Sequence, residues 1–132
     1  MKKVPLLFIS LTIIWAFVTN CKGSKRQANI QFDKDTIHFS ISQGKVFKTV
    51  FRLKNIGDED LNILNVSGDC SCTNIEYPKN AISAGKSAEI KVTYNSSSDE
   101  GEVKKIIVVK SNTDPILHTL TLKGMITKIM NF

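Results

Sequence analysis

Two cysteines separated by a single residue, Cys70 and Cys72, have the clearest capacity for chemistry in this sequence. In an extended strand they would share a face, with Cα atoms about 6.5 Å apart, near the limit for a disulfide. A bridge between them therefore requires the chain to bend. The pair could be a structural disulfide, two small buried side chains, a thiol redox site or thiolate ligands of a soft metal such as Cu(I). We favour the two structural interpretations.

A metal site at this pair would need a further ligand, and the two histidines are the candidates. His38 alternates with Ile37 and Phe39 and is therefore expected on a solvated face. His118 shares the side of nearby leucines, where a hydrogen-bonded histidine near a strand end is the common explanation. Neither histidine has ligand spacing, so the sequence predicts no metal ion and no cofactor.

The sequence also lacks the patterns of a catalytic site. No G-x-S-x-G elbow accompanies a histidine base. Asp58, Glu59 and Asp60 are adjacent, but they form a turn cluster without a partner at catalytic spacing. We therefore expect a protein that is not an enzyme.

The charge of the chain is mildly basic. The formal net charge is +6, and removing Lys2 and Lys3 with a leader leaves 18 − 2 = 16 basic against 12 acidic residues, or +4. The lysines are scattered one or two per predicted strand, which is typical of a solvated sheet face. Nucleic acid is therefore not an expected partner.

The N-terminus has the pattern of an export signal. Met1-Lys2-Lys3 is positively charged and is followed by an uncharged apolar run over residues 4–18. This run is shorter than the roughly 20 apolar residues of a spanning helix, and Pro5 interrupts it. Residues 1–20 are therefore predicted to be a signal peptide, with an uncleaved signal anchor as an alternative.

Val18-Thr19-Asn20-Cys21 resembles the lipobox of bacterial lipoproteins, in which the cysteine is diacylated and the leader is cut just before it. A lipobox usually has a small residue where this chain has Asn20. The other alternative is therefore an ordinary secreted protein in which Cys21 is incidental. Lipidation of Cys21 would leave two cysteines of the three, which removes the odd thiol in an oxidising compartment.

Residues 21–29 are then a lipidated cysteine and a flexible polar tether. This predicts a membrane-anchored protein of the cell envelope that faces the periplasm, with the outer membrane favoured over the inner one. Its expected partners are the membrane, through the lipid, and a protein of the envelope. The sequence does not predict an oligomeric state.

Residues 30–132 have the size of one domain and alternate apolar and polar residues in short stretches bounded by Gly, Asn, Asp or Ser. This period is typical of strands with one buried face. The clearest predicted strands cover residues 36–41, 46–54, 88–94 and 103–110. The last of these is apolar on both faces at its centre, which predicts a middle strand.

Two further stretches are less regular. In the strand that begins at Leu61, the apolar phase shifts at Leu64 and Val66, which predicts a β-bulge. Gly124 in the final strand marks either a bulge or a close approach. That strand is expected to present four apolar residues on one side: Ile116, Leu120, Leu122 and Ile126. About seven strands in roughly 100 residues predict an all-β, immunoglobulin-like β-sandwich.

Short motifs follow one another through this domain: Phe51-x-Leu53-x-Asn55-x-Gly57, Leu61-x-Ile63-x-x-Val66, Cys70-x-Cys72-Thr73, Gly85-x-Ser87, Ile90-x-Val92-x-Tyr94-Asn95, Gly101, Ser111-Asn112 and Leu120-x-Leu122-x-Gly124. In this order they resemble the bacterial domain-of-unknown-function family numbered fifteen seventy-three, whose members are often short lipoproteins. Such domains are similar to the immunoglobulin-like domains of Hydin and abnormal-spindle proteins. The resemblance covers roughly residues 39–126 and implies a fold and an envelope location, but no reaction.

Two functional hypotheses follow. The first is a non-enzymatic, lipid-anchored binding or scaffolding module that uses a sheet face or an exposed edge strand for partners. The second is a periplasmic thiol redox or copper-handling protein that uses Cys70 and Cys72.

Overall fold

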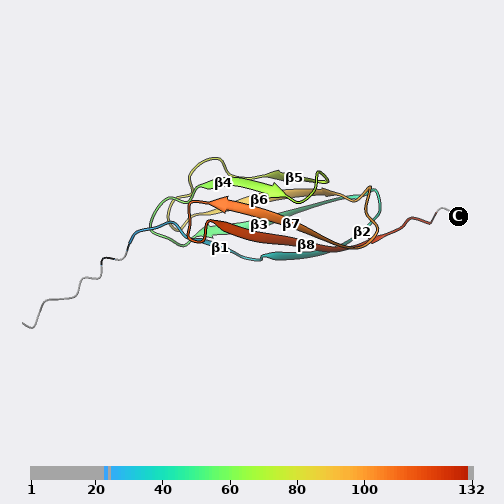
Figure 1. Ribbon diagram of the computed structural model, residues 1–132, viewed down its shortest axis with the longest axis horizontal. Helices are drawn as coiled ribbons and strands as arrows, with labels where there is room; N and C mark the ends of the chain where they lie inside the picture. The colour runs from blue at the N-terminus through green and yellow to red at the C-terminus, as the bar shows by residue number, and fades with distance from the viewer. Residues whose placement is uncertain (1–22, 24, 131–132) are drawn as a thin grey trace, which may run out of the picture.

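The computed structural model describes residue 23 and residues 25–130 (Figure 1). The predicted signal peptide and the predicted lipidation site, Cys21, lie outside these residues. Within them, no helix is long and apolar enough to cross a membrane. The described chain forms eight strands: β1 (Ile30–Phe32), β2 (Thr36–Ser42), β3 (Val46–Asn55), β4 (Ile63–Gly68), β5 (Thr73–Glu76), β6 (Ser87–Asn95), β7 (Gly101–Ser111) and β8 (Leu117–Thr127).

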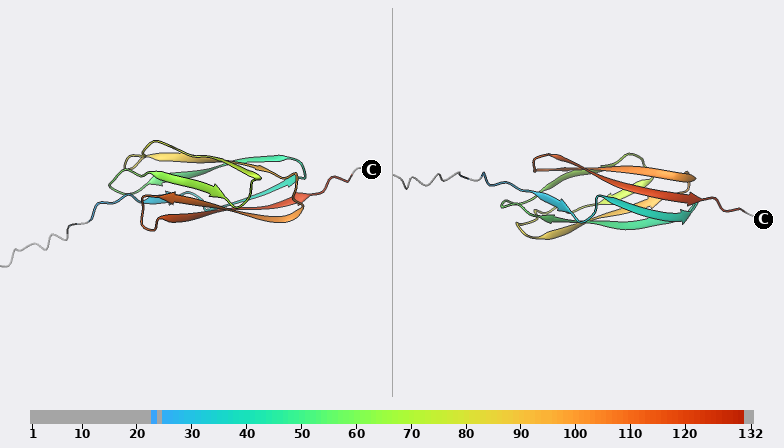
Figure 2. Two further views of the ribbon diagram at one scale, coloured as in Figure 1. Left: turned by 45° about the horizontal axis from the view of Figure 1, so that its top comes forward. Right: turned by 90° about the horizontal axis from the view of Figure 1, so that it is seen from below.

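The strands form two four-stranded sheets that pack face to face (Figure 2). One sheet has the order β1-β3-β6-β5 and the other the order β2-β8-β7-β4. Neighbouring strands are antiparallel except β2 and β8, which run parallel from Thr36↔Thr121 to Ser42↔Thr127. The predicted all-β, immunoglobulin-like sandwich is therefore confirmed. The short strands β1 and β5 were not individually predicted.

The core lies between the sheets and follows the predicted alternation. Along β3, Phe51 and Leu53 are buried, whereas Lys48 and Arg52 are exposed. The predicted middle strand β7 pairs with β8 on one side and with β4 on the other. The register of β4 shifts between Ile63 and Asn65, which confirms the predicted bulge.

The final strand departs from the prediction at its start. Leu120, Leu122 and Ile126 are buried as expected, but Ile116 is 53% exposed. The pairing of β8 with β7 ends at Leu117, so Ile116 belongs to the preceding turn, where its carbonyl accepts the Ser111 N–H at 2.9 Å. At Gly124, a Cβ atom would overlap the ring of Phe39 on β2, so this glycine marks a close approach.

Asn55, at the end of β3, is fully buried and organises the turn that follows. Its side-chain Nδ2 donates hydrogen bonds to the carbonyls of Glu59 and Ile82, each at 2.8 Å. Its Oδ1 accepts a hydrogen bond of 3.0 Å from the backbone N–H of Gly57. Because buried polar groups need such partners, the asparagine fixes the path of the chain between β3 and β4.

Gly57 lies against the backbone that leads from the tether into β1. A Cβ atom on this residue would come 2.8 Å from the carbonyl carbon of Ala28. On either side of the glycine, Ile56 N–H donates to the Asn29 carbonyl at 3.0 Å and Asp58 N–H donates to the Gln27 carbonyl at 3.1 Å. The absence of a side chain at Gly57 therefore lets residues 27–29 dock against this turn.

The strand directions put residues 25–29 and residues 128–130 at opposite ends of the sandwich (Figure 1). We call the end remote from residues 25–29 the distal end. It carries the turn between β2 and β3, the cysteine turn between β4 and β5, and the loop at residues 96–100 between β6 and β7. A hydrogen bond from Ser96 N–H to the Lys45 carbonyl, at 3.1 Å, joins two of these segments.

Candidate functional site

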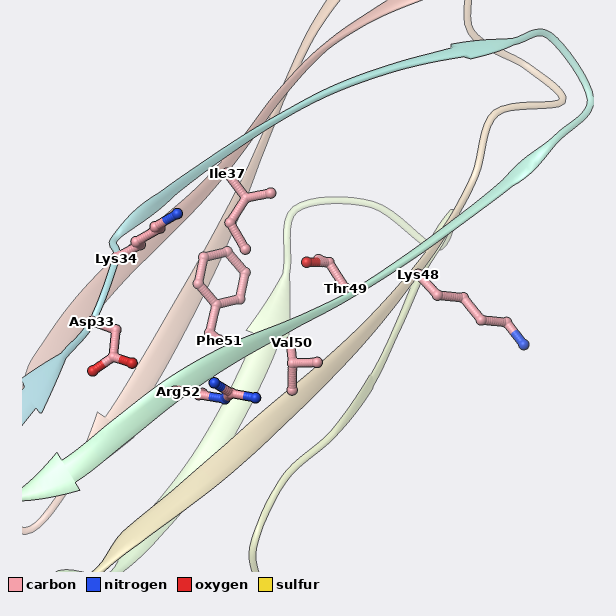
Figure 3. A pocket seen from close by; sticks show the side chains of 8 residues that line it. All are labelled: Asp33, Lys34, Ile37, Lys48, Thr49, Val50, Phe51 and Arg52. Carbon is pink, nitrogen blue, oxygen red and sulfur yellow. The ribbon is translucent and has the colours of Figure 1, made fainter.

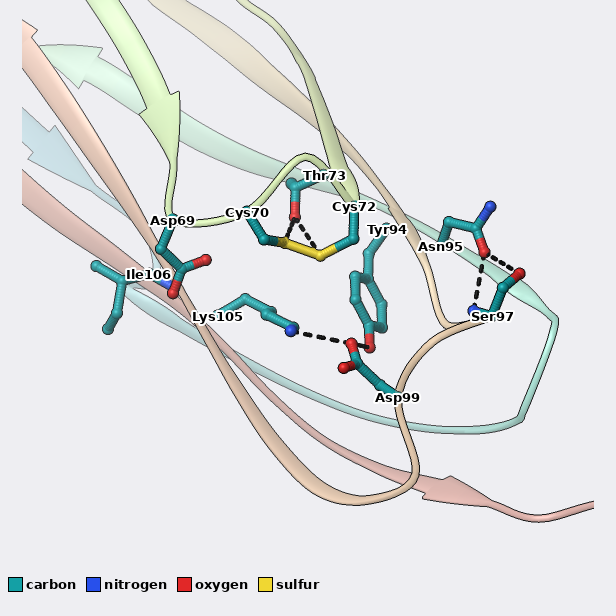
Figure 4. The surroundings of a disulfide bond; sticks show 10 residues. All are labelled: Asp69, Cys70, Cys72, Thr73, Tyr94, Asn95, Ser97, Asp99, Lys105 and Ile106. Carbon is teal, nitrogen blue, oxygen red and sulfur yellow. Dashed lines mark hydrogen bonds and ion pairs between the residues drawn. A yellow bond between two sulfur atoms is a disulfide. The ribbon is translucent and has the colours of Figure 1, made fainter.

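Cys70 and Cys72 form a disulfide at the distal end, in the turn between β4 and β5 (Figure 4). Their Cα atoms are 5.2 Å apart, closer than in an extended strand, because the chain turns through Ser71. β4 and β5 are edge strands of different sheets, so the bridged turn carries the chain from one layer to the other.

Backbone contacts hold this turn on both sides. Asp69 N–H donates to the Ile106 carbonyl at 3.0 Å, and the Asp69 carboxylate accepts the N–H of Ile106 at 2.9 Å. On the other side, Asn95 N–H donates to the Cys72 carbonyl at 2.9 Å. The turn is therefore attached to β7 and to the end of β6 independently of the disulfide.

A polar cluster lies next to the disulfide (Figure 4). The Thr73 hydroxyl is 3.5 Å from Cys70 Sγ and 3.9 Å from Cys72 Sγ, and Thr73 pairs across the sheet with Tyr94. The Tyr94 hydroxyl donates to the Asp99 carboxylate, which also forms an ion pair of 2.9 Å with Lys105.

The ionisation of this cluster follows from its contacts. The hydrogen bond from Tyr94, followed by that from Lys105, lowers the pKa of Asp99 below its ordinary value of 3.8. Burial raises the pKa of Tyr94 above its ordinary value of 10.0, and the Asp99 hydrogen bond and charge add to this effect. Asp99 is therefore a carboxylate and Tyr94 a neutral donor at neutral pH, which is a structural arrangement rather than that of a general base.

The two histidines do not join the cysteines. His38 is exposed on β2, as predicted. His118 Nε2 lies 2.8 Å from the Thr113 hydroxyl, and burial lowers the pKa of its imidazole. Over residue 23 and residues 25–130, His, Cys, Asp and Glu side chains form no group of three that could hold a metal ion.

We expect replacement of both cysteines, Cys70→Ser with Cys72→Ser, to lower stability modestly. A bridge that closes so short a loop removes little entropy from the unfolded chain, so the loss should be about 1–2 kcal/mol. Thermal unfolding followed by circular dichroism would measure it, and reduced wild-type protein should match the variant. Thiol exchange or copper binding by the purified wild-type protein, lost in the variant, would instead support the redox or copper hypothesis.

A second candidate site lies along β3, on the side that faces β1, which is mostly open. The sequence predicted an exposed edge strand as a binding surface but did not predict its position. β1 pairs only with residues 53–55 of β3, after which the chain crosses to the other sheet and forms β2. A groove of about 460 Å³ lies along the uncovered part, between β2 and β3 (Figure 3). It is lined by Asp33, Lys34, Ile37, Lys48, Thr49, Val50, Phe51 and Arg52.

This groove combines apolar and cationic walls. Ile37 and Phe51 point into the space between the two strands, whereas Lys48 points outward (Figure 3). Three cations line the groove against one carboxylate, and one of the cations, Arg52, forms an ion pair of 3.2 Å with Glu89. The electrostatic balance of the groove is therefore positive.

Comparisons with known proteins show that similar folds occur in proteins of unrelated function. No curated protein matches the sequence. A protein of unknown function from Porphyromonas gingivalis W83 superposes with a TM-score of 0.66 and 14% identity, over 76% of this chain and 47% of that one. The ASH/PapD-like domain 7 of human CEP192 has a TM-score of 0.62 and 13% identity, over 79% of this chain and 89% of that one.

The YadV chaperone has a TM-score of 0.57 and 16% identity, over 78% of this chain and 54% of that one. The chain thus spans about half the length of YadV and of the Porphyromonas protein. Other similar structures are proteases and glycoside hydrolases, of which it spans between 20% and 32%. At these low sequence identities, the structural similarity establishes the fold and nothing about function.

The sequence itself gives the closer assignment. Residues 30–126, which include every strand except the last residue of β8, match the protein family described as "Protein of unknown function (DUF1573)". The ordered motifs that run from Phe51 to Gly124 fall within this match. The chain therefore belongs to the DUF1573 family, and its fold is an immunoglobulin-like β-sandwich of two four-stranded sheets.

Proposed function

We propose that the protein is a non-enzymatic binding or scaffolding module of the cell envelope, acylated at Cys21 and facing the periplasm, with the outer membrane as the favoured site. The observation that carries this proposal is what lies at each of the two ends of the sandwich. Residues 25–29 lead into the sandwich at one end, and the open edge of β3 extends toward the distal end. A lipid at Cys21 would then hold the domain to a membrane and leave this edge free for a partner.

The chemistry of the described residues also favours binding over catalysis. The polar cluster near the disulfide is satisfied internally, since Asp99 is engaged by both Tyr94 and Lys105. Over residue 23 and residues 25–130, no buried side-chain nitrogen or oxygen lacks a hydrogen-bond partner. By contrast, the backbone along the open edge of β3 can accept another strand.

We expect Cys21→Ser to release the protein from membranes, because serine has no thiol to acylate. Intact mass spectrometry of wild-type protein extracted from membranes should show the added lipid, and the variant should lack it and appear in the soluble fraction. The variant with Cys70→Ser and Cys72→Ser is the matched control and should stay with the membrane. An unmodified wild-type N-terminus would contradict the anchoring proposal.

The binding part of the proposal has a separate test. Crosslinking in intact cells, followed by purification of the protein from an envelope extract, should recover a partner that depends on the folded domain. Recovery of the export and processing machinery alone would count against a binding role, whatever the state of Cys21.

A further inference from the structure

We propose that the open edge of β3 binds an extended segment of a partner protein, in which acidic and apolar residues alternate, as an added strand. This inference rests on the proposed binding function and assigns it a surface and a partner chemistry. The surface, called here the β3 edge, comprises Val46–Arg52 together with the groove residues Lys34 and Ile37.

The first argument concerns backbone hydrogen bonds. N–H and C=O groups of successive residues point to opposite sides of a strand. Because the Arg52 carbonyl accepts the N–H of Asp33, at 3.1 Å, the even-numbered residues of β3 direct these groups toward the β1 side. β1 ends before it reaches Val46, Lys48 and Val50. Their backbone groups therefore face a position that a further strand, in line with β1, would occupy.

The second argument concerns the inward side chains of such a strand. They would lie beside the inward residues of β3, over Ile37 and Phe51, in the groove of about 460 Å³. Its volume is within the roughly 300–1,000 Å³ of ordinary ligand sites. Ile37 is only partly buried against the core, whereas Phe51 is 1% exposed, so the apolar surface open to an added strand belongs mainly to Ile37 and an apolar residue suits the position beside it.

The third argument concerns charge on the outward face. Lys48 and Arg52 point outward from β3, and acidic residues on the added strand would lie next to them. Neither Lys48 nor Lys34 has an ion-pair partner within residue 23 and residues 25–130. The outward positions Val46 and Val50 are 49% and 40% exposed, and a neighbouring strand would cover them in part. Acidic residues outward and apolar residues inward give the alternating pattern.

A second copy of the chain is a weaker fit for the same edge. Pairing of two β3 edges would bring Lys48 and Arg52 of both copies onto one outward face, where like charges repel. Edge lysines are a common device against such self-pairing. We therefore assign the edge to a partner that carries the opposite charge.

The test uses the full-length protein in detergent micelles and a capped synthetic peptide of alternating Glu and Val, about seven residues long to match Val46–Arg52. In amide NMR spectra, the Lys48 and Val50 signals should shift on titration and become protected from hydrogen exchange. A peptide of alternating Lys and Val, and a Glu/Val peptide N-methylated at every second residue, should not bind.

Two variants separate the contributions. Val50→Pro removes an edge N–H that the fold does not use and should abolish binding. Lys48→Glu preserves the backbone and should weaken the Glu/Val peptide about tenfold while admitting the Lys/Val peptide. Lys104→Glu makes the same charge change on an exposed residue of the other sheet and should leave binding unaltered.

The proposal is overturned if the Glu/Val peptide does not bind at about 1 mM, a weak-affinity limit. It is also overturned if Lys48→Glu and Lys104→Glu weaken binding equally, or if the wild-type protein instead dimerises through this edge. Membrane attachment and envelope crosslinks of the same variants are measured separately. If a variant loses peptide binding but keeps its envelope crosslinks, the partner does not bind at the β3 edge. The proposed binding function itself would not be contradicted.

Discussion

Asn55→Ala is expected to lower the free energy of unfolding by about 3 kcal/mol, or about 1 kcal/mol for each of three lost hydrogen bonds. Such a loss is a large part of the roughly 5–15 kcal/mol that stabilises a typical domain. The asparagine is fully buried, so water cannot replace its side chain without rearrangement of the turn after β3. Urea unfolding of the variant and the wild-type protein would measure the difference.

The matched control for this change is Asn74→Ala. Asn74 is exposed on the edge strand β5, and its loss should change stability by less than about 0.5 kcal/mol. Equal effects of the two variants would show that the buried asparagine does not organise the turn.

Gly57→Ala is expected to cost about 2–3 kcal/mol, because the added methyl group meets backbone rather than a flexible side chain. Residues 27–29 would have to move away, which removes Ala28 from the core and disturbs β1. Hydrogen exchange should show the loss first at the amides of Ile56 and Asp58, which donate to this segment.

Gly68→Ala tests whether any new methyl group would have this effect. At Gly68 a Cβ atom would lie 3.4 Å from Thr73 Cβ, and the glycine has no positive φ. Its replacement should change stability by less than about 1 kcal/mol. If Gly57→Ala were as mild, the docking of the tether segment on this turn would not depend on the glycine.

The sequence was a good guide to the longer strands, for a physical reason. Strands such as β3 and β6 bury one face, so the alternation of apolar and polar residues records their position directly. β1 and β5 have only three and four residues, too few for alternation to be recognised. Ile116 was misplaced because its apolar character does not reveal where the pairing of β8 with β7 ends.

The candidate sites were harder to predict, since each depends on contacts between distant residues. Asn55 and Gly57 stood out as a motif, but the Ile82 carbonyl that Asn55 contacts is 27 residues away. The open edge of β3 exists because the chain leaves that sheet after Phe32 and joins the other one at Thr36. No local sequence pattern around Lys48 or Val50 indicates that the chain crosses from one sheet to the other.

The parallel pairing of β2 with β8 has a mechanical consequence for an anchored domain. If the tether is pulled toward the membrane and the C-terminus away from it, β2 and β8 are loaded in opposite directions along their common axis. The hydrogen bonds between the seven residue pairs from Thr36↔Thr121 to Ser42↔Thr127 are then stretched together, in shear, rather than peeled apart in succession. Force along this axis must therefore break these hydrogen bonds together rather than one at a time.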